Sequence, residues 1–259
     1  MIVDLHNHTP LCNHAEGRLQ EYIEYAIKNG TKVFGFSDHA PMEFDPKYRM
    51  KFEEMKKYEK SVLNAKTEYK KDIEILLGYE VDYLKGHMDK RVLNANVDYL
   101  IGSVHFLEGW GFDNPEFIGK WEEQNIDEIW QRYFDTIEEM AKTELFDIVG
   151  HFDLIKVFKF MPKGDIVKMA FKALLAIKAS GMVLELNVAG YRKKVEEPYP
   201  SRELLEVAFT LNIPITFSSD AHKPEQVAMF NDEIVEMARA VGYTKCSYFR
   251  GRKRQEMAF

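Results

Sequence analysis

Histidines gather at the start of the chain, and their type and spacing suggest metal chemistry. The opening MIVDLHNHTPLCNHAEG holds His6, His8 and His14, three of the eight histidines in the protein. Neutral imidazoles, especially beside carboxylates, are ligands for Zn²⁺, Mn²⁺ and Fe²⁺. A lone histidine is more often a hydrogen-bonded structural residue. The positions of the remaining histidines therefore decide between the two interpretations.

Most of the other histidines follow the ends of predicted strands. Apolar runs predict strands at 2–5, 32–37, 73–81, 98–104, 146–150, 182–186 and 215–219. The candidate ligands at or just beyond these ends are His6, His8, His14, His39, Glu80, His105, His151, Asp220 and His222. Only His87 falls outside the pattern. Seven of eight histidines at equivalent places favour one common site over chance.

Amphipathic stretches alternate with these strands. We predict helices at 18–30, about 47–71, 87–96, 126–143, 165–180, 201–212 and 224–241, and a last edge strand at 246–249. The stripes expected to be buried are Leu19, Tyr22, Ile23, Ala26 and Ile27 in the first helix, and Phe52, Met55, Val62 and Leu63 in the second. Alternating strand and helix predicts an α/β fold with a parallel sheet. Seven units favour a closed, TIM-barrel-like arrangement, and no glycine-rich nucleotide loop is present.

A parallel barrel would bring the candidate ligands together. The C-terminal ends of its strands meet on one face, where active sites are built. Nine ligands exceed the needs of one ion, so we expect two or three metals with a bridging carboxylate. Closely spaced metals lower the pKa of a bridging water and hold the oxygens of an in-line displacement. The pattern therefore predicts a hydrolase, most naturally of a phosphate ester.

Composition narrows the classes of partner. The net charge of −7 and the lack of a basic stripe disfavour nucleic acid. No signal peptide or membrane-length apolar run is visible, so we expect a cytoplasmic protein that does not enter membranes. The basic run at 250–254 is expected to be a solvated tail, and two cysteines, Cys12 and Cys246, imply no disulfide framework.

Residues 107–125 interrupt the alternation. This stretch is rich in glycine and aromatic residues and predicts a loop insertion. A long loop in a compact domain is often a lid or a substrate wall. A packed surface loop is an equal alternative. For the first case, Trp110, Phe112 and Phe117 are the expected wall residues.

The motifs HNH, CNHAEG, SDHA, GYEVD, GSVH, GHFD and SSDAH occur in the order seen in the PHP (polymerase and histidinol phosphatase) superfamily. The resemblance spans nearly the whole chain, and ELNVAGYR at 185–192 is similar to the monofunctional histidinol-phosphate phosphatases. It implies a single PHP domain over 1–259 with a distorted (β/α)7 barrel. It also implies three divalent metal ions (Zn, Mn or Fe) at the strand C-terminal ends, and a small-molecule phosphate ester as substrate.

The resemblance also implies roles for individual residues. His6, His8, Glu80 and Asp220 would hold one metal; Glu80 would bridge to a second held by His105 and His151; His14, His39 and His222 would hold the third. Arg192 would contact the substrate phosphate. Lys156 matches a second basic position, with a surface lysine as an equal alternative. Asn187 would line the pocket or cap a turn, and Asp38 would orient a ligand imidazole or be purely structural.

The expected reaction is hydrolysis of histidinol phosphate by in-line attack of a hydroxide that bridges metals. Asp220, His222 or a metal-bound water would protonate the leaving group. One alternative is a PHP phosphoesterase acting on nucleotides. A metal amidohydrolase ranks lower, because the end of the fourth strand carries His105 where that family commonly has a lysine. A non-catalytic, metal-stabilised binding domain is disfavoured by the complete ligand set and Arg192.

Overall fold

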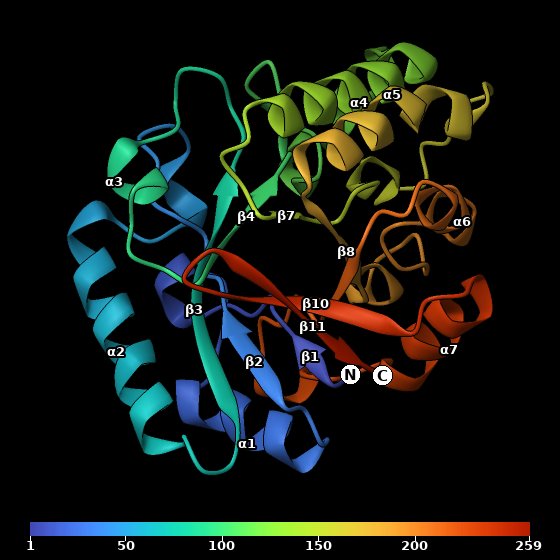
Figure 1. The fold of residues 1–259 in the computed structure, drawn as a ribbon. Helices are drawn as coiled ribbons and strands as arrows, with labels where there is room; N and C mark the ends of the chain where they lie inside the picture. Colours follow the sequence, from blue (N-terminus) through green and yellow to red (C-terminus); the bar gives the residue numbers. More distant parts are fainter.

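Seven parallel strands form a nearly closed barrel in the computed structural model, which describes residues 1–259 (Figure 1). In sheet order they are β1 (Val3–Asp4), β2 (Val33–Phe36), β3 (Glu74–Asp82), β4 (Tyr99–Ser103), β7 (Ile148–Val149), β8 (Val183–Asn187) and β9 (Ile215–Ser218). The Leu5 amide donates to the Phe217 carbonyl at 3.1 Å across the seam between β1 and β9. An isolated parallel bridge between Asn7 and Ala221 continues this seam. The predicted barrel of seven βα units is confirmed.

Helices surround the barrel on the outside (Figure 1). They are α1 (Leu19–Lys28), α2 (Met55–Glu68), the short α3 (Lys90–Leu93), α4 (Ile126–Lys142), α5 (Ile166–Ser180), α6 (Arg202–Thr210) and α7 (Asn231–Val241). Helix α5 has typical capping residues at both ends. The Asp165 side chain accepts from the Lys168 amide at its start, and Gly181 ends it at φ 74°. None of the helices is long and apolar enough to cross a membrane.

Three predicted helices are wrong in extent, and the one expected at 87–96 is only the four residues of α3. The second begins at Met55, because residues 46–48 and 52–54 form separate 3₁₀ turns. Its buried stripe is Met55, Tyr58, Val62 and Ala65, whereas the predicted Leu63 is half-exposed. The last predicted helix is split because Ala228 and Phe230 adopt positive φ, so that α7 starts at Asn231. In α1, the predicted core residue Ile27 lies on the exposed side.

Tyr99 fills part of the barrel interior. Its hydroxyl donates to the Leu5 carbonyl at 2.5 Å, which links β4 to β1 across the barrel. A Cβ at Gly35 would stand 2.1 Å from that hydroxyl, and one at Gly78 would stand 2.6 Å from the ring. The glycines in β2 and β3 are therefore required by the close approach of this one aromatic side chain.

The C-terminal segment is an ordered hairpin and not the expected solvated tail. Strands β10 (Lys245–Arg250) and β11 (Lys253–Ala258) pair around a turn at Gly251 and Arg252, both of which have positive φ, as a two-residue hairpin turn requires. Arg250 forms an ion pair with Glu74 at 2.6 Å, and Arg252 pairs with Asp147. The edge strand predicted at 246–249 is confirmed within β10.

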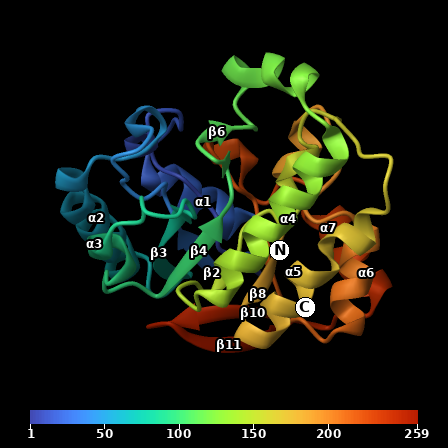
Figure 2. The same ribbon diagram turned by 90° about the horizontal axis from the view of Figure 1, so that it is seen from above.

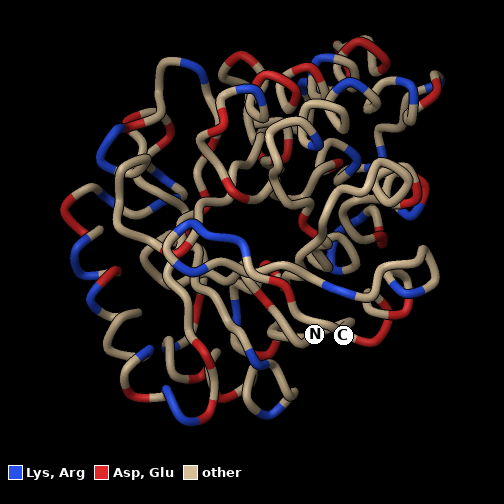
Figure 3. The backbone as a smooth tube through the Cα atoms, in the orientation of Figure 1, with Lys and Arg blue, Asp and Glu red and all other residues tan.

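The hairpin and the insertion lie at opposite ends of the barrel, with β10 and β11 at the bottom of Figure 2 and β6 at the top. The insertion holds a small hairpin, β5 (Phe106–Leu107) with β6 (Trp110–Gly111), and a 3₁₀ stretch at Pro115–Glu123. Cys12 and Cys246 are both buried and free. Lysine and arginine alternate with aspartate and glutamate along the outer helices (Figure 3).

Candidate metal centre

Strand register sets the predicted ligands side by side. An isolated parallel bridge joins His39, just beyond β2, to Glu80 in β3. Across the seam, the bridge between Asn7 and Ala221 places the two histidines that flank Asn7 beside Asp220 and His222. All nine predicted ligands lie at the C-terminal end of the barrel. Two residues there, His151 and Asp220, have positive φ, at 20° and 49°. Such strained conformations persist where the surroundings fix them, and they cluster at functional sites.

The ligands form overlapping groups whose donor atoms lie within 4.8 Å of one another. These groups are His6, His8 and Glu80; Glu80, His105 and His151; His14, His39 and His222; and His8, Cys12 and His222. We call His6, His8, Glu80, His105 and His151 the inner half of the centre. We call His14, His39 and His222 the outer triad. The first three groups match the predicted grouping by residue, and Asp220 Oδ1 lies 3.3 Å from His8 Nε2.

Glu80 is the hub of the centre. Its Oε2 lies 2.8 Å from His39 Nδ1 and 3.3 Å from His6 Nε2. Its Oε1 lies 2.9 Å from His151 Nε2 and 3.6 Å from His105 Nε2. A buried carboxylate with histidines on both oxygens has the geometry of a bridging ligand.

The donor atoms fit bound cations. In the outer triad, His14 Nδ1 donates to the Cys12 carbonyl at 2.8 Å and His222 Nδ1 to the Asp220 carbonyl at 3.2 Å. Each Nε2 is then left with a lone pair, yet the two Nε2 atoms are only 3.0 Å apart. A cation between them removes that repulsion. His6 Nε2, His8 Nε2 and Glu80 Oε2 are buried without hydrogen-bond partners, as expected of atoms that coordinate a metal ion.

Electrostatics divides the two halves. Burial alone would lower the pKa of His105, but Asp82 and Glu80 raise it to about 10. The pKa of His6 is also raised well above its ordinary value, because Glu185 and Glu80 outweigh its burial. In the outer triad, burial together with His39 and His8 lowers the pKa of His14 to about 4.

The same two causes act on the other members. Burial would raise the pKa of Glu80, but the surrounding histidines hold it well below its usual range. The pKa of His39 is lowered by burial, which outweighs the nearby Glu80. Burial and the neighbouring His8 hold the pKa of His222 well below its usual value. The outer triad is therefore neutral at pH 7, whereas His6 and His105 of the inner half carry protons.

Buried carboxylates behind the ligands fix their orientation. Glu185 accepts from His6 Nδ1 at 2.7 Å and from the His151 amide at 2.6 Å. Asp82 accepts from His105 Nδ1 at 2.5 Å and pairs with the buried Arg49 at 2.5 Å. Such partners set the tautomer of a ligating imidazole and raise its basicity. Sequence reasoning missed Glu185 and Asp82, although Asp82 stands in the same strand as Glu80 and Glu185 stands in β8, between the strands that precede His151 and Asp220.

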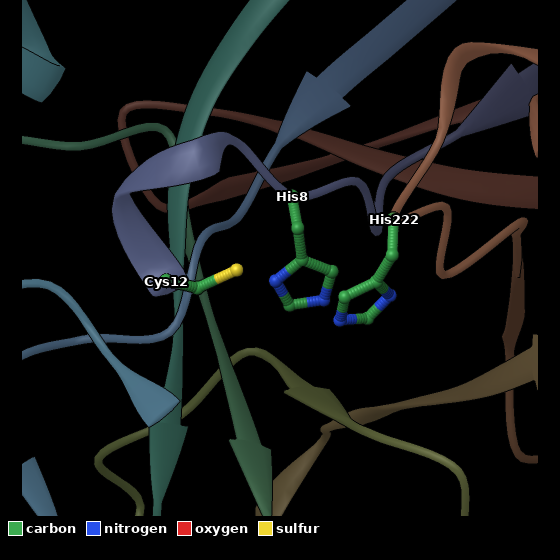
Figure 4. A group of neighbouring side chains, drawn as sticks. All are labelled: His8, Cys12 and His222. Carbon is green, nitrogen blue, oxygen red and sulfur yellow. The ribbon is translucent and has the colours of Figure 1, made fainter. Parts of the chain in front are cut away.

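Asp38, singled out from the sequence, lies behind His8. Its Oδ1 is 3.4 Å from His8 Nδ1, and its Oδ2 accepts from the Thr9 hydroxyl. Cys12 approaches the same imidazole: Figure 4 shows its sulfur pointing at the ring of His8, with His222 on the other side. The rings of His8 and His222 stack with centroids 4.1 Å apart. The thiol is fully buried and was not expected at the site.

Arg192 borders the cavity of about 410 Å³ above the ligands. Its Nη2 donates to the carbonyls of Ser219 and Asp220 at 2.8 and 2.9 Å, while Nη1 is buried without a partner. Burial lowers the pKa of Arg192, and Asp220 opposes that shift. A guanidinium anchored on one side and free on the other is well placed to take an anion.

Lys156 and Asn187, both predicted to contact substrate, form hydrogen bonds with other protein groups. Lys156 is buried, so the alternative of a surface lysine is wrong. Its ammonium reaches Asp153 at 2.9 Å, Glu197 at 3.1 Å and the Pro198 carbonyl at 2.8 Å. Those contacts use its three donors, which leaves none for a phosphate.

Asn187 is equally engaged. Its amide nitrogen donates to Glu185 and to Asp220, each at 3.1 Å. Its carbonyl oxygen accepts from the Ala189 amide at 2.8 Å, which caps the turn after β8. Lys156 and Asn187 thus hold the cavity walls through these contacts, and their roles in substrate binding stay predictions.

The insertion contributes to the cavity, but mostly through other residues than expected. Phe117 lines it. Phe112 is buried against Trp121 and Tyr133, and Trp110 packs on Trp121 with centroids 5.1 Å apart, so neither forms the wall. The carboxylate of Asp113, which sequence reasoning did not single out, faces the cavity instead.

Comparison with known proteins gives a consistent result. The model of the PHP domain family matches residues 4–189. A probable histidinol-phosphatase of Deinococcus radiodurans is 37% identical over 98% of both chains. The histidinol-phosphatase of Bacillus subtilis is 28% identical over 90% of this chain and 98% of its own. A Lactococcus lactis histidinol phosphate phosphatase, solved with zinc, L-histidinol and phosphate, superimposes with a TM-score of 0.80 over 98% of both chains at 19% identity.

Proposed function

This chain belongs to the PHP domain family, and we propose that it is a metal-dependent phosphatase that hydrolyses L-histidinol phosphate to L-histidinol and phosphate. The observation that carries the proposal is the convergence of eight histidine and carboxylate donors with Cys12 in four metal-binding groups below a cavity that Arg192 borders. The choice of substrate follows from the relatives that match over nearly their whole length, which are histidinol-phosphatases. The amidohydrolase and binding-domain alternatives are set aside, because the family and the enzyme class agree across those relatives.

We assign three divalent ions of zinc, manganese or iron to the inner half and the outer triad, with Asp220 completing the group of His6 and His8. When bound, such ions neutralise phosphate charge and lower the pKa of a coordinated water. Glu185 and Asp82 hold His6 and His105 in the orientation that ligation needs. Arg192 presents Nη1 to a phosphoryl oxygen and stabilises the charge that builds there in the transition state.

The group that protonates the leaving alkoxide is not assigned to a side chain. Asp220 and His222, the two side chains predicted for this role, are better suited to bind metal. Burial would raise the pKa of Asp220, but His6 and His8 hold it well below its usual range. The pKa of His222 is likewise held well below its usual value. Neither group carries a donatable proton at pH 7, so we propose both as ligands.

Asp113 gives the cavity a means to recognise the organic part of the substrate. Its carboxylate lines the same cavity as Arg192 and makes no side-chain hydrogen bond, whereas Asp82 is committed to Arg49 and His105. L-histidinol phosphate carries an ammonium beside its phosphate ester. We propose that Asp113 pairs with that ammonium and so orients the ester toward the ligands.

Phosphate release from metal-reconstituted protein tests the substrate. Histidinol phosphate, nucleoside monophosphates and p-nitrophenyl phosphate should be compared, with Glu80→Gln as the inactive control. We expect kcat/KM for histidinol phosphate to exceed that for nucleotides by about 100-fold or more, because polar groups of the site would be left unpaired by the wrong substrate. A preference for nucleotides would favour the alternative of a nucleotide phosphoesterase.

Two variants test the assigned contacts. Arg192→Ala should lower kcat/KM for every ester by about 100-fold, because a charge-assisted contact to phosphate is lost. Asp113→Asn should raise KM for histidinol phosphate and leave p-nitrophenyl phosphate, which lacks an ammonium, unaffected. Equal effects of Asp113→Asn on both esters would count against its pairing with the ammonium.

A further inference from the structure

The chain returns to the metal centre after Arg192 and seats Tyr199 beside the end of β8. Tyr199 forms an isolated antiparallel bridge with Asn187. The Asn187 amide donates to the Tyr199 carbonyl at 2.7 Å, and the Tyr199 amide donates to the Asn187 carbonyl at 2.9 Å. The backbone of this residue is thus fixed to the strand that also carries Glu185.

The ring of Tyr199 is held on several sides. Its edge packs against His151, with ring centroids 6.4 Å apart at 78°. The buried ammonium of Lys156 lies 5.5 Å from the ring centroid. A Cβ at Gly190 would stand 3.0 Å from the ring and 1.9 Å from the Glu197 carbonyl, so glycine is required for this close approach. These contacts position the ring but do not involve its hydroxyl.

The hydroxyl of Tyr199 is a buried polar group without a partner. The side chain is only 1% exposed, yet it borders the cavity together with Arg192 and His151. Burying a hydroxyl with no hydrogen bond is costly, and such groups usually bond to an ordered water or ion or have a role in function. Burial, reinforced by Asp153 and Asp220, raises the pKa of Tyr199, so the phenol keeps its proton.

Unpartnered buried atoms in and around the metal centre are of two kinds. His6 Nε2, His8 Nε2, His151 Nδ1 and Glu80 Oε2 belong to the predicted ligands. Arg192 Nη1 and the Tyr199 hydroxyl are hydrogen-bond donors that bind no cation, and both border the cavity. Two free donors beside a metal centre are complementary to an anion.

We propose that the Tyr199 hydroxyl donates a hydrogen bond to a non-bridging phosphoryl oxygen of the substrate, beside Arg192. The proposal rests on the proposed phosphatase function. It makes Tyr199 a substrate-binding residue that recognises the phosphoryl group and not the organic leaving group. The contact stays with inorganic phosphate after the ester bond breaks, and it is absent with L-histidinol alone.

Tyr199→Phe tests the contact, because it removes only the hydroxyl. We expect kcat/KM to fall by about 10- to 100-fold, the effect of one hydrogen bond to a charged group. Inhibition by inorganic phosphate should weaken by a similar factor, whereas inhibition by L-histidinol should be unchanged. Metal content, measured by elemental analysis, should equal that of the wild type. A role in packing alone would not separate the two products.

Tyr243→Phe is the matched control. The hydroxyl of this buried tyrosine donates to the Ile213 carbonyl at 2.9 Å, away from the metal centre. The control should lower Tm and keep wild-type kinetics, while Tyr199→Phe should keep or raise Tm. Unchanged kcat/KM and phosphate inhibition in Tyr199→Phe, or an equal loss of both product inhibitions, would overturn the proposal.

The experiment also separates this proposal from the substrate assignment. All kinetics are repeated with p-nitrophenyl phosphate. A wild type that hydrolyses this ester but not histidinol phosphate contradicts the proposed substrate, and the Tyr199→Phe effect is still measured on phosphate inhibition. A wild type specific for histidinol phosphate with an unaffected Tyr199→Phe contradicts only the phenol contact.

Discussion

The inner half and the outer triad are built from the same side chain and have opposite electrostatics. His105 has its pKa raised to about 10, whereas that of His14 is lowered to about 4. Burial lowers both pKa values, but neighbouring carboxylates overcome it at His105, whereas His39 and His8 reinforce it at His14. His105 touches Asp82 and Glu80, while His14 hydrogen-bonds a backbone carbonyl and faces His222. Both imidazoles are buried, so the carboxylate neighbours of His105 account for the difference between it and His14.

The difference has a chemical meaning for each half. In the inner half the imidazolium protons compensate the buried carboxylates until metal replaces them. In the outer triad no carboxylate stands between His14 and His222, so metal enters without displacing protons there. The halves should therefore differ in how strongly they depend on Glu80, on the carboxylates behind the ligands and on pH.

The largest expected effect comes from removing the hub. Glu80→Gln takes the bridging carboxylate from the inner half, so both of its groups should lose metal affinity, and activity should fall by about 1000-fold or more. Metal content by elemental analysis and phosphate release measure this. Glu59→Gln, on the outside of the barrel, serves as the control and should behave as wild type. Full metal content in Glu80→Gln would show that the two halves are not distinguished by this carboxylate.

A smaller effect is expected from the outer triad. His14→Ala should lose the ion of that triad only and lower activity by about 100-fold, because one of the charges facing the phosphate disappears. Added metal should restore part of the activity, since His39 and His222 remain. Elemental analysis should compare the metal content of His14→Ala with that of Glu80→Gln. Equal losses in the two variants would mean that the centre binds its ions as one unit.

Asp82→Asn should weaken the inner half without removing a ligand. The variant no longer stabilises the His105 imidazole or the Arg49 guanidinium, and metal affinity should fall about 10- to 100-fold. Competition with a chelator measures this affinity. Asp98→Asn, which disturbs an ion pair with Lys66 elsewhere, should leave it unaltered. An unaltered affinity in Asp82→Asn would deny the carboxylate its role in orienting His105.

The last prediction concerns the number of protons that each half releases when it binds metal. Below a pKa of about 10, ligation must displace a proton from His105, so inner-half affinity should rise about tenfold per pH unit for each proton displaced. His14, with a pKa of about 4, is already neutral above pH 5, so outer-triad affinity should be flat from pH 6 to 8. Calorimetry in buffers of different ionisation enthalpy counts the protons. Equal proton release from both halves would contradict the contrast.

The sequence allowed the ligands to be predicted but not the groups that tune them. His39, His105 and His151 could be placed because strand ends in a parallel barrel share one face. Glu185 and Asp82 also stand near strand ends, but a single acidic residue in an apolar run does not reveal which imidazole it will meet. Tyr199 reaches the cavity through a bridge to Asn187 that no periodicity shows.

Misassigned residues have equally local causes. The basic run at 250–254 has the composition of a tail, and only tertiary partners such as Glu74 and Asp147 make it a hairpin turn. Lys156 has the charge of a phosphate contact, but its donors are used by Asp153, Glu197 and Pro198. Composition and spacing do not reveal which side-chain donors are already hydrogen-bonded to other protein groups in the fold.

The seam between β1 and β9 makes the order of synthesis matter. Few backbone hydrogen bonds join these strands, yet His8 from the start of the chain and Asp220 from near its end meet across them. A chain growing on the ribosome contains Glu80, His105 and His151 well before Asp220 and His222 emerge. The nascent protein thus contains all members of two of its four metal-binding groups early, and the ions that join its two ends can enter only after the last strand has closed the barrel.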